Sequence, residues 1–168
     1  MTTNPHPAEA SPAQSTTTAT RRPAPTALDV VAWEDPLIDG MGFDPRSVYV
    51  EQFWLGILGP SAVWFLRLVA RELETQPDGF HLELEILAQQ LGVGLRGGRN
   101  APVHRTIDRL CRFGLVRRGA TSIAVRRMLP PLTAVQVSRL PETLQAAHEH
   151  FAISLQASRR LPPTGDAA

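Results

Sequence analysis

Apolar residues between positions 46 and 73 recur every three to four residues, the period of an α-helix with one buried face. Gly59 and Pro60 divide this stretch, because proline ends a preceding helix but fits the first turn of a new one. The pattern therefore predicts a short helix before Gly59 and a central core helix that runs to about Leu73.

Trp54 and Trp64 lie on these two predicted helices. Exposed tryptophans can stack on nucleic-acid bases, but tryptophans at helical spacing beside aliphatic residues usually belong to a core. We therefore expect both side chains to be buried.

Residues 80–113 predict a short strand followed by two further helices. Pro77-Asp78-Gly79 is a turn signal before the strand, and the run ELEILAQQLG fits a helix. A basic loop, GLRGGRN, comes next. The following helix starts at Asn100 or Ala101, with Pro102 in its first turn.

Apolar and polar positions alternate within residues 115–128, which predicts a β-hairpin. Its strands are LVRR and SIAVRRM, joined by Gly119-Ala120-Thr121. Beyond Pro130-Pro131 we expect a short helix around 133–140 and a longer one opened by Pro141. The apolar face of that longer helix comprises Leu144, Ala147, His148, Phe151 and Leu155.

The remaining segments lack a sustained period. Residues 1–27 are rich in proline and threonine without an apolar block, so we expect a disordered tail and no signal peptide or membrane anchor. Residues 28–45 mix apolar residues with acids, prolines and glycines, which favours an irregular lead-in segment. The expected fold class is therefore mainly α with a small β-hairpin.

Charge divides the chain into two parts. Residues 96–127 contain nine arginines against one acid, Asp108, a local net charge of +8, whereas residues 28–95 contain eleven acids and three arginines, a net charge of −8. A basic surface beside an acidic one attracts a polyanion in one orientation, as expected of a nucleic-acid binder. We attribute the absence of lysine from the chain to GC-rich codon usage.

The helix that starts near Pro102 separates its apolar and basic residues. At about 100° per residue, Arg105, Arg109 and Arg112 lie opposite the stripe of Val103, Ile107 and Leu110. A recognition helix needs this geometry, because one face is held by the body and guanidinium groups project toward phosphate or guanine. Asp108 is placed to hold Arg105 and Arg112 in one rotamer, or to accept from cytosine; we favour the first role.

The run VHRTIDRLCRFGLV (103–116) resembles the recognition helix of winged helix-turn-helix regulators of the MarR and GntR type, and LAQQLGV (87–93) resembles their second helix. The resemblance covers about 60–128. It implies a winged helix with extra N- and C-terminal helices, double-stranded DNA as the partner, and transcription regulation. The pattern VYVEQFWLGILGPSAVW also resembles uncharacterised proteins of GC-rich actinobacteria, which implies no activity.

The order of the predicted elements and the distribution of arginines give the expected domains and contacts. The domains are a tail at 1–27, a lead-in segment and short helix at 28–58, the winged helix at 59–130, C-terminal helices at 131–157 and a tail at 158–168. Helix residues are expected to reach bases and hairpin residues phosphates, with Arg117 and Arg126 favoured over Arg118 and Arg127. The predicted DNA contacts are Arg96, Arg99, His104, Arg105, Asp108, Arg109, Arg112, Arg117, Arg118, Arg126 and Arg127.

The chain departs from the family between the second and third helices. A turn of three or four residues is usual there, and this chain has GLRGGRNAP. We interpret Arg96 and Arg99 in this loop as an additional phosphate clamp.

The sequence favours no enzyme, cofactor or metal site. Cys111 is the single cysteine, which excludes an internal disulfide and suits a reducing cytoplasm. His104, Asp108 and Cys111 share a helix flank but lack a fourth ligand, and no phosphate-binding glycine loop follows a strand.

Two alternatives to a transcription regulator stay open. A winged helix can be an interaction module that holds an acidic protein surface, or part of a plasmid- or phage-type replication or partition protein. We also favour a homodimer through residues 141–155, with docking of that helix on the chain's own first helix as the alternative.

Overall fold

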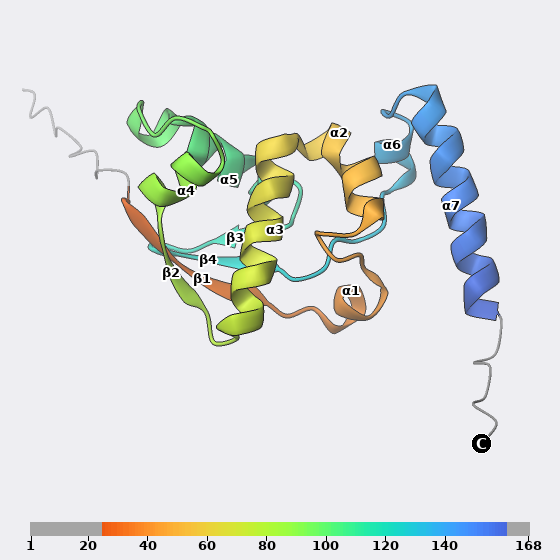
Figure 1. Cartoon of the computed structure of the whole chain (residues 1–168), viewed down its shortest axis with the longest axis horizontal. Coiled ribbons are helices and arrows are strands. Elements are labelled where there is room, and N and C mark those ends of the chain that lie inside the picture. Colours follow the sequence, from red (N-terminus) through yellow and green to blue (C-terminus); the bar gives the residue numbers. More distant parts are fainter. Residues whose placement is uncertain (1–24, 161–168) are drawn as a thin grey trace, which may run out of the picture.

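The computed structural model describes residues 25–160, apart from the side chains of Arg99 and residues 158–160 (Figure 1). The strands are β1 Ala27–Trp33, β2 Phe80–Glu83, β3 Val116–Arg118 and β4 Ser122–Arg126. The helices are α1 Pro36–Met41, α2 Leu55–Leu58, α3 Pro60–Thr75, α4 Leu84–Gln90, α5 Pro102–Arg112, α6 Ala134–Val137 and α7 Glu142–Arg160. A π-helical turn, Val50–Trp54, precedes α2, and a 3-10 turn, Gly98–Asn100, precedes α5.

The fold is mixed α/β, because its strands form one sheet of four rather than an isolated hairpin. The order across the sheet is β2-β1-β4-β3. Strand β1 pairs antiparallel with β2 and parallel with β4, where Val30 lies opposite Ile123 and Trp33 opposite Arg126. The segment expected to be an irregular lead-in thus supplies a central strand, whose pairing partners lie far away along the chain.

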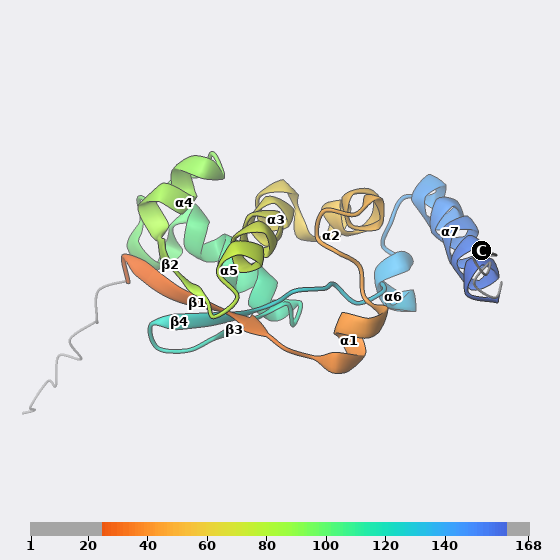
Figure 2. The ribbon, with the colours of Figure 1, turned by 60° about the horizontal axis from the view of Figure 1, so that its bottom comes forward.

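Helices α3, α4 and α5 cover one side of the sheet, as Figure 2 shows. Fully buried residues from both layers form a single core, including Val30, Ile123 and Val125 from the strands and Phe65 and Leu110 from the helices. The predicted core helix and hairpin are confirmed. Of the two tryptophans expected in the core, Trp54 is buried, but Trp64 is exposed.

Helix α7 lies at the end of the molecule away from β2 and docks on the chain itself (Figure 1). The Phe151 ring lies 5.1 Å from the Tyr49 ring, and the Tyr49 hydroxyl lies 3.0 Å from Nε2 of His148. Leu144 and Ala147 pack against the same core. The chain itself therefore covers much of the apolar face that suggested a homodimer through 141–155, and dimerisation stays a prediction.

Two of these elements extend into the segments expected to be tails. Strand β1 begins at Ala27, within the segment expected to be disordered, and α7 continues to Arg160, past the expected end at residue 157. The rest of both tails, residues 1–24 and 161–168, lies outside the described residues.

Leu110→Ala tests the burial of α5. Leu110 has no exposed surface, so we expect the substitution to lower the free energy of unfolding by about 2–5 kcal/mol through lost burial and the cavity left behind. Urea denaturation monitored by circular dichroism measures the change. Arg112→Ala on the exposed side of the same helix is the control, and equal stability of the two variants would contradict the assigned helix orientation.

The docking of α7 is expected to weaken at acid pH. The Tyr49 hydroxyl accepts from the Leu132 amide at 2.8 Å, so its own proton points to His148, which must then be neutral. Burial lowers the pKa of His148 below its ordinary value of 6.5, against the opposing effect of Glu149. Because the unfolded chain takes up this proton first, the stabilisation is complete above pH 6.5 and is lost as pH falls toward the folded-state pKa.

Urea denaturation between pH 8 and pH 5 measures this effect. The fall in stability below pH 6.5 should be smaller in His148→Gln, whose amide can still accept from Tyr49 but does not titrate. An unchanged pH dependence in that variant would assign the effect to other histidines.

Candidate nucleic-acid interface

Helix α5 presents arginines on the face opposite its buried stripe. Val103, Ile107 and Leu110 have no exposed surface, which confirms the predicted helix phase. Pro102 opens the helix, as the sequence predicts. The exposed arginines of α5 are Arg105, Arg109 and Arg112.

One side of α5 is fixed to the start of α3. The Thr106 hydroxyl donates to the Pro102 carbonyl at 3.0 Å and lies 3.3 Å from the Ser61 hydroxyl. Nη1 of Arg109 donates to the Leu58 carbonyl at 2.9 Å, next to Gly59, which has a left-handed φ of +82°. One donor of the Arg109 guanidinium therefore helps to hold α5 against the end of α2.

Arg105 and Arg112 are the least restrained cations on α5. Both are exposed, and neither forms an ion pair with another residue in the part of the chain that the structure describes. Asp108 was expected to hold them, but its carboxylate pairs with Nη1 of Arg118 at 3.1 Å. The hairpin runs beside this flank of α5 and brings a closer cation, so that expectation is corrected.

Arg126, which was predicted to bind phosphate, makes several contacts within the fold. Its Nε donates to the Gly114 carbonyl at 2.9 Å, and its Nη1 donates to Asp35 Oδ2 at 2.5 Å. The side chain is 15% exposed. Alternation along β4 does place Arg126 on the outer face of the sheet, but Trp33 and Asp35 cover it there.

Trp33 lies between two guanidinium groups. The Cζ atoms of Arg117 and Arg126 lie 3.6 and 3.8 Å from its ring centroid. Both cannot fit over the same ring face at these distances, so the indole is sandwiched between them. Cation–π contacts of this kind add stability while leaving the outer edge of Arg117 in solvent.

The same cluster connects the sheet to α1. Asp35 is the N-cap of α1, and its carboxylate accepts from the Ile38 amide. The hydrogen bond from Arg126 is the main cause that lowers the pKa of Asp35 below its ordinary range. Asp35 therefore stays ionised, as the Arg126 contact requires.

The other predicted contacts are dispersed. Arg96 is exposed in the segment between α4 and α5, and the Arg99 side chain lies outside the described residues. Arg127 is exposed but lines a separate pocket with Asp44 and Glu74. The structure thus brings together only part of the predicted basic face.

His104 does not belong to the exposed face of α5. It is 4% exposed and lines a pocket with Asn100, Asp108 and Arg118. This burial does not favour the predicted contact of His104 with DNA, which stays a prediction.

Sequence reasoning missed the part played by Trp33 and Asp35 in holding Arg126. Their partner is more than ninety residues away along the chain, and the only local signal was an acidic residue before Pro36, which is typical of a helix N-cap.

The described residues contain neither a metal site nor a membrane-spanning helix. Within residues 25–160, no group of three or more histidine, cysteine, aspartate or glutamate side chains is arranged to hold a metal ion. Among the same described residues, none of the helices has both the length and the apolar character that a membrane crossing requires.

Comparison with protein-family models, curated proteins and solved structures finds no match to this chain.

We expect Arg126→Ala to lower the free energy of unfolding, whether or not a ligand is present. It removes the bond to the Gly114 carbonyl and the contact with Trp33, a loss of about 1–3 kcal/mol in the free energy of unfolding. Urea denaturation measures it, with Arg112→Ala as a control expected within about 0.5 kcal/mol of the wild type. A stable Arg126→Ala protein would return Arg126 to the candidate phosphate ligands.

Proposed function

We propose that the protein binds double-stranded DNA through the exposed face of α5 and acts as a transcription regulator in the cytoplasm. The observation that carries the proposal is the division of α5 into a fully buried apolar stripe and an opposite arginine face. A rigidly held helix with projecting guanidinium groups suits the major groove, where arginine donates to the O6 and N7 atoms of guanine.

The order of elements supports a winged helix. Helix α3, strand β2, helices α4 and α5 and the β3–β4 hairpin follow one another as in the winged helix-turn-helix regulators that residues 103–116 resemble. Two features set this chain apart from the simple motif. Strand β1 lies inside the sheet, and eleven residues separate α4 from α5.

We assign the arginines different tasks in this proposal. Arg105 and Arg112 are proposed to read base edges, since they are exposed and not paired with any acid among the described residues. Arg118 is proposed to meet phosphate, because its partner Asp108 is half exposed and the pair can open at little cost. Arg126 supports the site through the fold and does not contact DNA in this proposal.

An acidic protein surface is the rival partner for the same arginine face. The two partners differ in how their binding depends on salt. With roughly five phosphate contacts, the logarithm of the affinity for random duplex should fall with the logarithm of salt concentration at a slope of about −4 to −5. Absence of duplex binding even at low salt would reject the DNA proposal and favour the protein partner.

Arg105→Ala and Arg112→Ala are expected to weaken binding to a preferred duplex by about 1–3 kcal/mol each and to relax the preference at particular base pairs. Arg118→Ala should weaken all duplexes about equally and make the salt slope shallower by about one. Fluorescence polarisation on duplexes selected from a random pool measures both effects.

Arg139→Ala is the matched control, because Arg139 is an exposed arginine between α6 and α7, outside α5 and the hairpin. It should bind like the wild type. Equal losses in Arg139→Ala and Arg105→Ala would show that only total charge matters, and the assignment of α5 as the reading helix would be wrong.

A further inference from the structure

A groove on the outer face of α3 is unexplained by DNA binding. Trp64 is 54% exposed there, and two adjoining pockets of about 290 and 370 Å³ share Trp64 and Arg67 in their walls. The first pocket extends toward Leu55 of α2 and the second toward Gln90 of α4. The groove is therefore built by α2, α3 and α4, not by α5.

Apolar surface is concentrated beside this groove. Leu55 is partly exposed in the wall of the first pocket, and Ile86, one turn before Gln90 on α4, is about half exposed. A large exposed tryptophan flanked by aliphatic residues is typical of protein contact sites, where tryptophan and arginine carry much of the binding energy.

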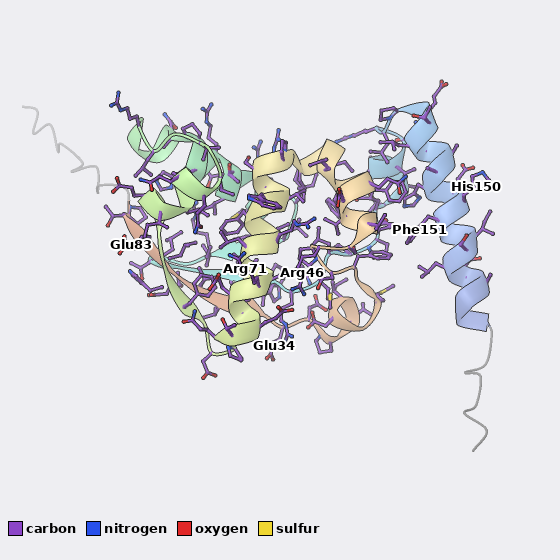
Figure 3. All side chains as sticks on the ribbon, in the orientation of Figure 1. Glu34, Arg46, Arg71, Glu83, His150 and Phe151 are labelled. Atoms are coloured by element: carbon purple, nitrogen blue, oxygen red, sulfur yellow. The ribbon has the colours of Figure 1, made fainter. Side chains whose placement is uncertain are left out.

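The charge around the groove is distinctive. Residues 28–95 contain three arginines, and all three line the second pocket, together with Trp64, Leu68 and Gln90 and without an acidic residue. Figure 3 shows two of them, Arg46 and Arg71, close to each other beside α3. The cations of the acidic half of the chain thus converge on one pocket.

The three arginines are restrained to different degrees. Arg46 is held firmly, since its guanidinium donates to both Asp44 and Glu74 at 2.5–2.9 Å. Arg67 lies 3.6 Å from Glu51, and Arg71 lies 3.3 Å from Glu72, its sequence neighbour. The Arg71 pair is exposed and contributes little stability, so Arg71 can exchange its partner for a ligand carboxylate at small cost. Arg67 is 28% exposed and its Cζ also lies 5.3 Å from the centroid of the Trp64 ring, which keeps its guanidinium beside the exposed indole.

We propose that this groove binds an acidic peptide segment of a partner protein. A large apolar side chain of the peptide packs on Trp64, and its carboxylates meet Arg67 and Arg71. Two open pockets that adjoin at Trp64 and Arg67 suit an extended or helical segment better than a compact small molecule.

A nucleic acid fits this groove less well. Glu51, Glu72 and Glu74 surround the arginines and would repel a continuous line of phosphates. Separated carboxylates on a peptide can avoid these acids and still reach the guanidinium groups. The observations therefore favour a protein partner for α3 and leave DNA to α5.

The test is selection from a displayed library of random twelve-residue peptides on the full chain, with depletion on Trp64→Ala. Enriched peptides should combine net negative charge with an aromatic or large aliphatic residue. A synthetic peptide from this set should bind at least tenfold more weakly to Trp64→Ala and to Arg71→Glu, as measured by fluorescence polarisation. Arg112→Ala is the control and should bind the peptide like the wild type.

A charge reversal sharpens the test. A version of the peptide with lysine in place of its acids should prefer the Arg67→Glu, Arg71→Glu double variant over the wild type. Both arginines are at least partly exposed, so this variant tests the groove even where Trp64→Ala lowers the melting temperature.

Several results would overturn the proposal. They are no enrichment over Trp64→Ala, enrichment of neutral or basic peptides, or peptide binding that both groove variants retain. Loss of duplex affinity in Arg71→Glu would make the groove a DNA surface instead, and loss of self-association in Trp64→Ala by sedimentation would make it a contact between copies of this chain. If Trp64→Ala and Arg71→Glu both still bind duplex, DNA binding by α5 and peptide binding by the groove are independent of each other.

Discussion

The parallel pairing of β1 with β4 is the constraint on which the rest of the structure depends. It places Val30 beside Ile123 beneath the helices and Trp33 beside Arg126 on the outer face. A hairpin alone is marginally stable in water, so β4 needs this neighbour to become a fixed wall for α5. The direction in which α5 presents its arginines thus depends on a strand that lies some seventy residues earlier in the chain.

The same constraint explains why a count of arginines overstates the candidate binding surface. Contacts that hold α5 and the hairpin on the body occupy several guanidinium groups. Arg126 donates to the Gly114 carbonyl and to Asp35, Arg109 donates to the end of α2, and Arg118 pairs with Asp108. Arginine suits such positions, because its planar fork can stack and donate at the same time. The chain uses one residue type both to hold α5 in place and to equip its outer face.

Sequence periodicity predicted the elements whose partners are close along the chain. The phase of α5 was readable from Val103, Ile107 and Leu110, and the hairpin from alternation around its turn. Strand β1 was not predicted, because its seven apolar and acidic residues form a strand only when β2 and β4 pair with it on either side. Trp64 was assigned to the core because helical spacing gives the direction of a side chain but not the extent of the neighbours that cover it.

Contacts between distant charges were beyond prediction for a related reason. Asp108 has Arg105 and Arg112 nearby on its own helix, and a rule based on helical spacing selects them. The fold instead brings Arg118 to the Asp108 carboxylate across the gap between α5 and β3. This exchange frees the two helix arginines from their nearest acid, so the tertiary contact increases the positive charge that α5 presents, although the number of charges is unchanged.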